Sequence, residues 1–143
     1  MHQITETLAV GNIYDAERPP ATFGALLLVA EEFSIEPPAG LAYSKIPLKE
    51  YGEAGIDSLD RAVGWIERQL PANRVLVCCR AGMGRSVSVV MAYLCCVQGM
   101  AYPDVWELAK TKRPGAVPLP NLRSTIERLQ QLRQTRKPTA PPR

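Results

Sequence analysis

The most informative segment of this chain reads Arg74-Val75-Leu76-Val77-Cys78-Cys79-Arg80-Ala81-Gly82-Met83-Gly84-Arg85-Ser86. Its first apolar residues are typical of a short buried β-strand, and the apolar pattern that follows it is typical of a helix. A cysteine lies where the intervening loop begins, and an arginine and a serine lie where it ends. This order of parts predicts a pocket for a phosphoryl group with a nucleophile at its floor.

The loop from Cys79 to Ser86 has the composition of an anion-binding loop. Gly82 and Gly84 allow backbone conformations that a Cβ forbids, so the loop's N–H groups can point inward around an anion. The first turn of the following helix adds unpaired N–H groups and the positive end of its dipole. Arg85 supplies a planar charged fork that fits two phosphate oxygens. The same positive field favours the thiolate form of the cysteine, which is the form that attacks.

The spacing of Cys79 and Arg85, followed by Ser86, resembles the signature of cysteine-dependent protein tyrosine phosphatases. The Ala-Gly-Met-Gly between them resembles the small dual-specificity branch of that superfamily. Looser similarities flank the loop, in Leu8-Ala-Val-Gly11-Asn12 with Tyr14-Asp15-Ala16, in Ile46-Pro47-Leu48-Lys49-Glu50, and in Lys112-Arg113-Pro114 with Asn121. The resemblance covers roughly residues 4 to 133 and implies hydrolysis of phosphate monoesters through a phosphocysteine intermediate.

The resemblance also implies roles for individual residues. Cys79 is the expected nucleophile, and Ser86 is expected to hydrogen-bond its sulfur and help it leave in the second step. The substrate phosphate is expected to bind the loop residues Arg80, Ala81, Gly82, Met83, Gly84 and Arg85. From their position alone, Arg80 and Met83 project from the rim and could tune substrate choice. Asn121 is expected either to brace the loop or to cap the last helix.

The general acid of this family is usually aspartate, whereas Glu50 occupies the best-matching position here. A group that protonates the leaving oxygen needs a carboxylic acid near the pocket on a segment that can move. Glu50 follows a predicted strand, and Gly52 and Gly55 come soon after it. We therefore predict Glu50 as the general acid, with Glu53 and Asp57 as competitors, although Asp57 is also explained as a helix N-cap.

The family usually has histidine immediately before the nucleophile, and this chain has Cys78 there. One interpretation is a redox partner that protects Cys79 from overoxidation. The alternative is a packed strand cysteine, because strand side chains alternate between faces and a bond between neighbouring cysteines is strained. Cys95 and Cys96 are expected to lie in the core of a helix.

Along the chain, strand patterns alternate with helix patterns. We expect strands at residues 8–10, 25–30, 41–48 and 74–78, and helices at 57–70, 86–98, 103–112 and from Leu122 onward. This alternation predicts an α/β fold with a largely parallel central sheet flanked by helices, and with the active-site loop between a strand and a central helix. The length of 143 residues fits one catalytic domain over residues 1–136, followed by a disordered tail at 137–143.

Composition excludes several classes of protein. Apolar residues make up 46% and charged residues 22% of the chain, which is ordinary for a globular protein. The four cysteines form two adjacent pairs rather than a disulfide framework. Metal-ligand spacing is absent, and the only histidine, His2, is expected at a mobile terminus, so we predict no metal. The implied phosphatase chemistry needs no cofactor. With no visible signal peptide or apolar run of membrane-spanning length, the expected setting is a reducing cytoplasm.

The net charge of +3 hides a difference between the two parts of the chain. Residues 110–143 hold nine Lys or Arg and only one acid, Glu127, whereas the other residues sum to −5. Such a basic end can attract nucleic acid, anionic lipid or an acidic protein. No aromatic residues interleave these charges. We therefore interpret the basic end as a solvated helix face with a tail, and expect a monomer that does not bind nucleic acid.

The predicted activity is that of a protein phosphatase that hydrolyses phosphotyrosine, with phosphoserine and phosphothreonine as further candidates, in a phosphorylated protein or peptide. A phosphatase of RNA 5′ ends or inositol phosphates would use the same loop. A non-catalytic phosphate-binding module would be expected to lose the nucleophile, and Arg85-Ser86 argues for phosphate over the sulfur transfer of a sulfurtransferase. The depth of the pocket separates phosphotyrosine from the shorter side chains.

Overall fold

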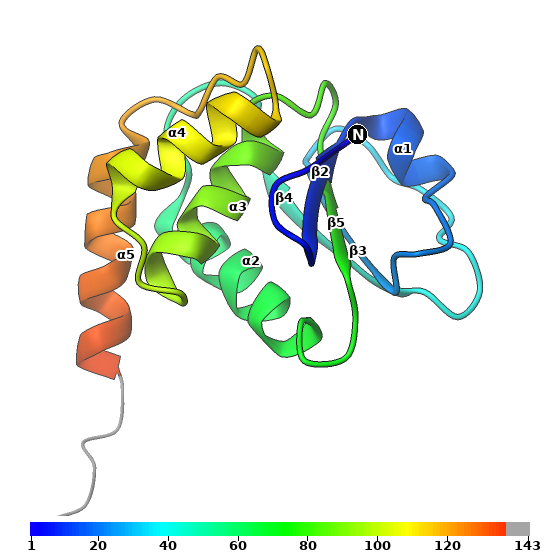
Figure 1. Cartoon of the computed structure of the whole chain (residues 1–143), viewed down its shortest axis with the longest axis horizontal. Coiled ribbons are helices and arrows are strands. Elements are labelled where there is room, and N and C mark those ends of the chain that lie inside the picture. The colour runs from blue at the N-terminus through cyan, green and yellow to red at the C-terminus, as the bar shows by residue number, and fades with distance from the viewer. Residues whose placement is uncertain (137–143) are drawn as a thin grey trace, which may run out of the picture.

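The computed structural model describes residues 1–136, and the predicted disordered tail at 137–143 lies outside the described residues. Within them the chain forms a sheet in the order β1–β2–β5–β3–β4 (Figure 1). The strands are β1 (His2–Gln3), β2 (Leu8–Gly11), β3 (Ala25–Ala30), β4 (Ala42–Leu48) and β5 (Val75–Cys78). All neighbouring pairs are parallel except β1 with β2, so the prediction of a largely parallel sheet is confirmed.

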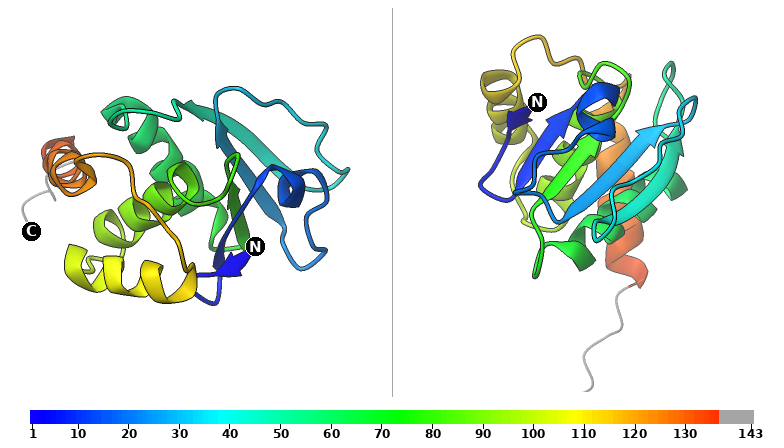
Figure 2. Two further views of the ribbon diagram at one scale, coloured as in Figure 1. Left: turned by 90° about the horizontal axis from the view of Figure 1, so that it is seen from above. Right: turned by 90° about the vertical axis from the view of Figure 1, so that its right-hand side faces the viewer.

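The helices are α1 (Ile13–Glu17), α2 (Ile56–Gln69), α3 (Arg85–Cys96), α4 (Tyr102–Lys112) and α5 (Leu122–Arg136). All of them except α1 form a layer against this sheet. The two views of Figure 2 show α2 to α5 gathered on one side of the sheet, whereas the short α1 lies apart from them. The predicted α/β class is therefore confirmed.

Strand β5 lies at the centre of the sheet, between β2 and β3. Its last residue, Cys78, is in register with Gly11 of β2 and Leu28 of β3. Every residue of β2, β3 and β5 is buried, as expected for parallel strands that are covered on both faces. The carboxyl ends of these three strands share one edge of the sheet, and ligands of open α/β sheets bind at that edge.

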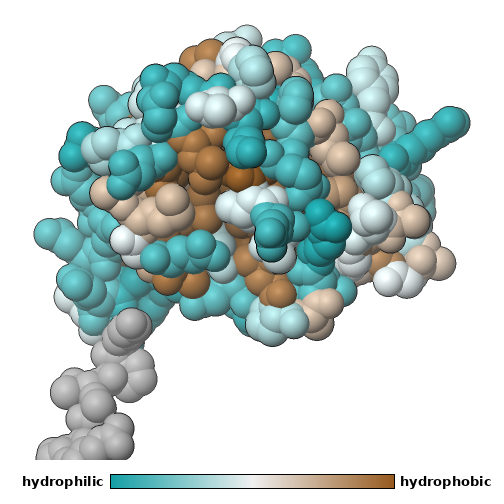
Figure 3. Space-filling model, viewed as in Figure 1, coloured by the Kyte–Doolittle hydropathy of each residue, from teal (hydrophilic) through white to brown (hydrophobic). Residues whose placement is uncertain are grey.

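Helix α3 is the centre of the helical layer. Its residues from Arg85 to Cys95 are all buried, because α2, α4 and α5 pack around it. Figure 3 shows hydrophobic side chains at the middle of this face, over α3, with hydrophilic side chains around them. Gly99, which we expect to end the helix, has φ of +70° shortly after it. The all-round apolar sequence thus predicts a central helix correctly, although the helix begins one residue earlier than expected.

Two local predictions are wrong. Asp57 does not cap α2, because the helix begins after Gly55, which makes no side-chain cap bond, and Asp57 lies inside the first turn. There its negative charge still interacts favourably with the positive end of the helix dipole. His2 is not at a mobile terminus, because it pairs with Val10 in the sheet and its Nδ1 lies 2.6 Å from Nη1 of Arg113.

Helix α1 has no counterpart among the predicted elements. It is only five residues long, and its start is fixed by a reciprocal pair of bonds. The backbone N–H of Asp15 donates to the side chain of Asn12, and the N–H of Asn12 donates to the Asp15 carboxylate, both at 2.9 Å. Since the N–H of Ile13 donates to the carbonyl of Arg80, at 3.1 Å, α1 also supports the loop that follows β5.

Candidate active site

Cys79 is the first residue after β5, at the carboxyl edge of the sheet. Its side chain is almost fully buried, and its backbone N–H donates to the carbonyl of Gly11 at 3.2 Å. Its Sγ lies 3.3 Å from Oγ of Ser86, within hydrogen-bonding distance. When the sulfur is a thiolate, the Ser86 hydroxyl is placed to donate to it. The structure therefore brings the predicted nucleophile and its predicted stabilising group together.

The loop that follows, residues 80–84, presents unpaired backbone donors. Among the described residues, none of its five N–H groups donates to a protein acceptor. Gly82 has φ of +73°, and a Cβ at this position would lie 2.6 Å from the carbonyl oxygen of Gly11. Only glycine fits there, for both reasons. Because α3 begins directly after Gly84, the loop and the helix N-terminus together form a concavity that suits an anion.

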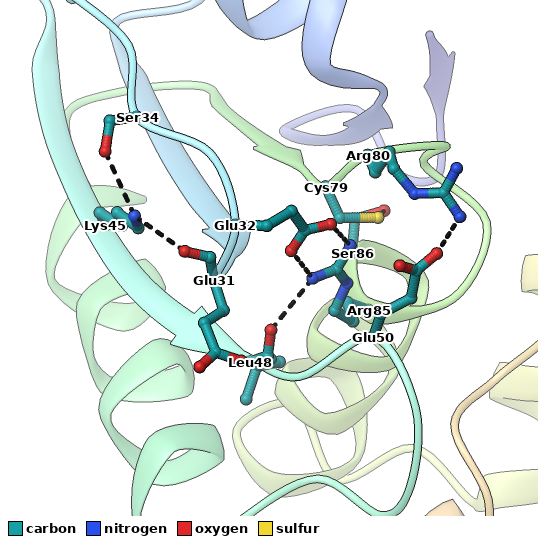
Figure 4. Close-up of polar contacts among 10 residues, drawn as sticks. All are labelled: Glu31, Glu32, Ser34, Lys45, Leu48, Glu50, Cys79, Arg80, Arg85 and Ser86. Carbon is teal, nitrogen blue, oxygen red and sulfur yellow. Dashed lines mark hydrogen bonds and ion pairs between the residues drawn. The ribbon is translucent and has the colours of Figure 1, made fainter.

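Arg85 is the first residue of α3, and its side chain is only 3% exposed. Its Nη1 donates to Oε1 of Glu32 at 2.6 Å and to the carbonyl of Leu48 at 3.0 Å, and its Nη2 donates to Oε2 of Glu32 at 2.7 Å (Figure 4). These bonds use three of the five N–H donors of a guanidinium. The remaining two, on Nε and Nη2, form one fork that suits a phosphate.

Glu32 is a site residue that the sequence analysis missed. It lies in the segment after β3, and the hydrogen bonds from Arg85 lower the pKa of its carboxyl to about 2, against the opposing effect of burial. The same contact raises the pKa of Arg85. Glu32 therefore stays ionised near neutral pH, which suits an anchor for the guanidinium and does not suit a proton donor. The one local signal was a pair of acidic residues, Glu31 and Glu32, directly after a buried strand.

Glu50 lies in the segment between β4 and α2, and its carboxylate forms an ion pair with Arg80 of the loop. It lines the same hollow as Cys79. Of the competitors, Glu53 faces Arg128 of α5 instead, at 3.9 Å. Asp57 lies within α2 and does not line this hollow. The structure thus places Glu50, rather than either competitor, beside the candidate nucleophile.

The hollow above Cys79 has a volume of about 300 Å³. Its lining comes from the segment between β4 and α2 that carries Glu50, from the loop after β5 and from the segment before α5. The lining residues are Glu50, Tyr51, Gly52, Cys79, Arg80, Ala81, Met83, Gly84, Arg85, Val117, Pro118, Leu119 and Pro120. All but two of the predicted site residues line it, since Gly82 and Ser86 support it from behind through the contacts described above.

A second arginine, Arg113, holds the outer side of the loop and was also not predicted as a site residue. It is 4% exposed, and it donates from Nε to the carbonyl of Gly82 at 3.0 Å and from Nη2 to that of Ala81 at 3.2 Å. Asn121, which we expected to brace the loop or cap α5, is exposed, and its side chain makes no hydrogen bond among the described residues. Its carbonyl accepts the N–H of Thr125 at the start of α5.

Cys78 occupies a fully buried strand position. Burial raises the pKa of its thiol well above the ordinary value. A thiol that stays protonated is a poor nucleophile and a poor redox partner. This environment favours the packed strand cysteine over the redox interpretation.

Within residues 1–136, no group of three or more His, Cys, Asp or Glu side chains is placed to hold a metal ion. No helix in this range combines the length and the apolar character that crossing a membrane requires.

The fold and the loop define a class of protein, and comparison with known families agrees with them. Residues 21–132 match the family described as dual specificity phosphatase, catalytic domain. This match covers well over half of the chain. The chain therefore belongs to the dual specificity phosphatase family.

Individual relatives are more distant. Human dual specificity protein phosphatase 15 is 34% identical over 89 residues, which are 61% of this chain and 30% of that protein. Dual specificity protein phosphatase 1B of Arabidopsis thaliana is 26% identical over 136 residues, which are 91% of this chain and 81% of that protein. The chain thus spans less than a third of the human relative. The crystal structure of human DUSP28 shares the fold, with a TM-score of 0.81 at 21% identity over 96% of this chain and 100% of that one.

The contact between Glu32 and Arg85 leads to a prediction for Glu32→Gln. An amide can accept one of the two bonds but carries no charge, so Arg85 is held less firmly, and we expect kcat/KM for an aryl phosphate to fall about tenfold. Because the pKa of Glu32 is lowered in the folded state, its contribution to stability is present above pH 4.5 and is lost as the pH falls through about 2.

Unfolding midpoints measured from pH 6 to pH 2 should therefore fall less steeply in Glu32→Gln than in the wild type. Glu31→Gln is the matched control, since Glu31 is exposed and contacts Lys45 through its backbone carbonyl, which glutamine keeps. Equal loss of activity in both variants would show that the contact of Glu32 with Arg85 has no special part.

Proposed function

We propose that this protein is a protein phosphatase that hydrolyses phosphotyrosine through a phosphocysteine intermediate, with phosphoserine and phosphothreonine as further substrates to be tested. The observation that carries the proposal is the arrangement around Cys79. Its buried sulfur lies at the start of a loop with unpaired N–H donors, next to the free fork of Arg85. Three equatorial phosphate oxygens fit these donors, and the sulfur is then in line to attack phosphorus.

In the first step, the thiolate of Cys79 forms a bond to phosphorus while the bond from phosphorus to the leaving oxygen breaks. Glu50, in its protonated form, gives its proton to that oxygen, so the alcohol or phenol leaves uncharged. Arg85 and the loop amides stabilise the charge on the equatorial oxygens throughout. The products of this step are the dephosphorylated side chain, a phosphocysteine and an ionised Glu50.

In the second step, Glu50 accepts a proton from a water molecule, and the oxygen of that water attacks phosphorus. The bond from phosphorus to sulfur breaks, which releases inorganic phosphate and the thiolate. Ser86 lies 3.3 Å from this sulfur and stabilises the thiolate by donating a hydrogen bond. Both steps balance without a metal ion or an organic cofactor, because the nucleophile, the acid and the phosphate-binding groups all come from the chain.

The rim of the hollow favours an aromatic leaving group. Tyr51 is 82% exposed and Val117 is 66% exposed, and both line the hollow together with Met83 and Pro118. Large apolar side chains that remain exposed at a site are typical of surfaces that bind apolar groups. The ring of phosphotyrosine can pack against them, whereas phosphoserine has too few apolar atoms. RNA 5′ ends and inositol phosphates carry further negative charge, whereas the basic residues that line the hollow are Arg80 and Arg85, each of which is paired with a glutamate.

Turnover of para-nitrophenyl phosphate by the wild type in the presence of EDTA tests this proposal. We expect hydrolysis that survives EDTA and is blocked by vanadate, which mimics the five-coordinate phosphorus of the transition state. Phosphotyrosine, phosphoserine and phosphothreonine peptides of one sequence should then be compared with inositol phosphates and 5′-phosphorylated RNA. Absence of any turnover under reducing conditions between pH 5 and 8 would argue for a phosphate-binding module instead.

We also propose that the protein works as a monomer in a reducing, cytoplasmic setting. All four cysteines are free, and the proposed chemistry requires Cys79 as a thiolate. Oxidation would block attack, so a reducing compartment suits this site. Activity that depends on a reductant and recovers after mild oxidation would support this setting.

A further inference from the structure

Two pairs of arginine and glutamate lie on opposite sides of Cys79 in the view of Figure 4. Glu32 and Arg85 form the first pair, in which the arginine is 3% and the glutamate 37% exposed, and this pair anchors the phosphate-binding guanidinium. Glu50 and Arg80 form the second pair, in which the arginine is far more accessible, at 51% exposed, and the glutamate is 29% exposed. The second pair joins the candidate general acid to the loop that holds the phosphate.

The segment that carries Glu50 has few backbone contacts, and its far end is held by the buried Ala54 and by Glu53, which faces Arg128 at 3.9 Å. Among the described residues, the backbone N–H and carbonyl groups of residues 49–54 form no hydrogen bond in turns or loops. Gly52 has φ of +92°, and a Cβ at Gly52 or at Gly55 would meet no atom within 4 Å, so this stretch is open on its outer side. The bond to Arg80 is the polar contact by which the Glu50 side chain is tied to the phosphate loop.

We propose that Arg80 is a positioning residue that holds Glu50 over the mouth of the loop and stabilises the carboxylate that forms when Glu50 gives up its proton. This inference rests on the proposed function, because it takes Glu50 as the general acid. Arg80 does not need to touch the substrate for this role. It acts through Glu50, by fixing where the carboxyl lies and by favouring its ionised form.

The charged groups around Glu50 decide in which direction a replacement of Arg80 changes the pH at which Glu50 loses its proton. Arg80 faces it from the phosphate loop, and Cys79 and Arg85 line the same hollow from the end of β5 and the start of α3. The charge of Arg85 is largely matched by Glu32. Removing the charge of Arg80 therefore makes the carboxylate less favourable and Glu50 a weaker acid, which keeps its proton to higher pH.

The test compares Arg80→Gln with the wild type over pH 5 to 9, for two substrates that differ in their need for an acid. Para-nitrophenyl phosphate releases a stabilised phenolate, whereas phenyl phosphate releases a poor leaving group and depends on proton transfer. We expect the alkaline limb of kcat/KM to move up by about 0.2 to 0.7 pH unit, the size of shift that an exposed ion pair supports. We also expect the loss at pH 6 to be about fivefold greater for phenyl phosphate.

Three further variants make the result specific. Arg80→Lys keeps the charge and should restore the alkaline limb. Glu50→Gln removes the acid and should abolish that limb, with a larger loss for phenyl phosphate than for para-nitrophenyl phosphate. Arg61→Gln removes a positive charge from an exposed position on α2 and should match the wild type. Because Arg80 is half exposed, its variants are expected to fold, which thermal unfolding checks.

Several outcomes would overturn the inference. An unchanged alkaline limb in Arg80→Gln, with equal losses for both substrates, would show that Arg80 only attracts the phosphate or supports the loop. If Glu50→Gln also kept the wild-type limb, Glu50 would not be the acid, although turnover that depends on Cys79 would leave the phosphatase proposal standing. If the wild type hydrolysed neither substrate, the proposed function would fail and the inference with it.

Discussion

Replacing Cys79 with serine is expected to lower kcat for para-nitrophenyl phosphate by at least about 10⁴-fold. The hydroxyl of serine stays protonated at neutral pH, and the side chain within hydrogen-bonding distance of this position is another hydroxyl, that of Ser86, which is a poor base. The loop donors and Arg85 remain in place in this variant. It should therefore still bind inorganic phosphate or a phosphotyrosine peptide, which calorimetry would measure.

Cys78→Ser is the matched control, because it makes the same change one residue earlier. Cys78 is fully buried in β5, so the cost is expected in stability, about 1 to 3 kcal/mol for a buried hydroxyl, rather than in kcat. If Cys79→Ser kept activity within tenfold of the wild type, the phosphocysteine route would be wrong. If Cys78→Ser folded but lost as much activity as Cys79→Ser, the interpretation of Cys78 as a packed strand cysteine would be wrong.

Replacing Arg85 with lysine is expected to lower kcat/KM by about 10²- to 10³-fold, and replacing it with alanine by more. Lysine keeps the charge but loses the fork, so it cannot donate to Glu32 and to a phosphate in two fixed directions at once. The alanine variant also leaves Glu32 without its partner beside the site. Steady-state kinetics together with inhibition by vanadate would separate loss of transition-state binding from loss of phosphate binding.

The control for Arg85 is Arg113→Lys, which changes an equally buried arginine that supports the loop from outside. It should lower the unfolding temperature and reduce activity less, because Arg113 contacts loop carbonyls rather than the hollow. Activity of Arg85→Lys within tenfold of the wild type would contradict a phosphate-binding role for the guanidinium fork.

Much of the fold could be predicted from short-range patterns. The continuous apolar run of β3 and the all-round apolar sequence of α3 mark elements that are buried on every side, and the structure contains both. Such patterns are local consequences of where water is excluded. Weaker local signals failed: the Asp57 cap was wrong because α2 begins after Gly55, and α1 and β1 were too short to produce a periodic pattern.

The candidate site likewise has a part that local sequence predicts and a part that depends on long-range contacts. The loop from Cys79 to Ser86 can be predicted without a structure, because its nucleophile, glycines and arginine are neighbours in the chain and their geometry follows from a strand, a turn and a helix start. The groups that surround this loop are brought to it by tertiary packing. Glu32 is 53 residues from Arg85, and Arg113 is 31 residues from Gly82. These contacts depend on the parallel register of β3 and β5 and on the packing of α4 against α3, which no local pattern encodes.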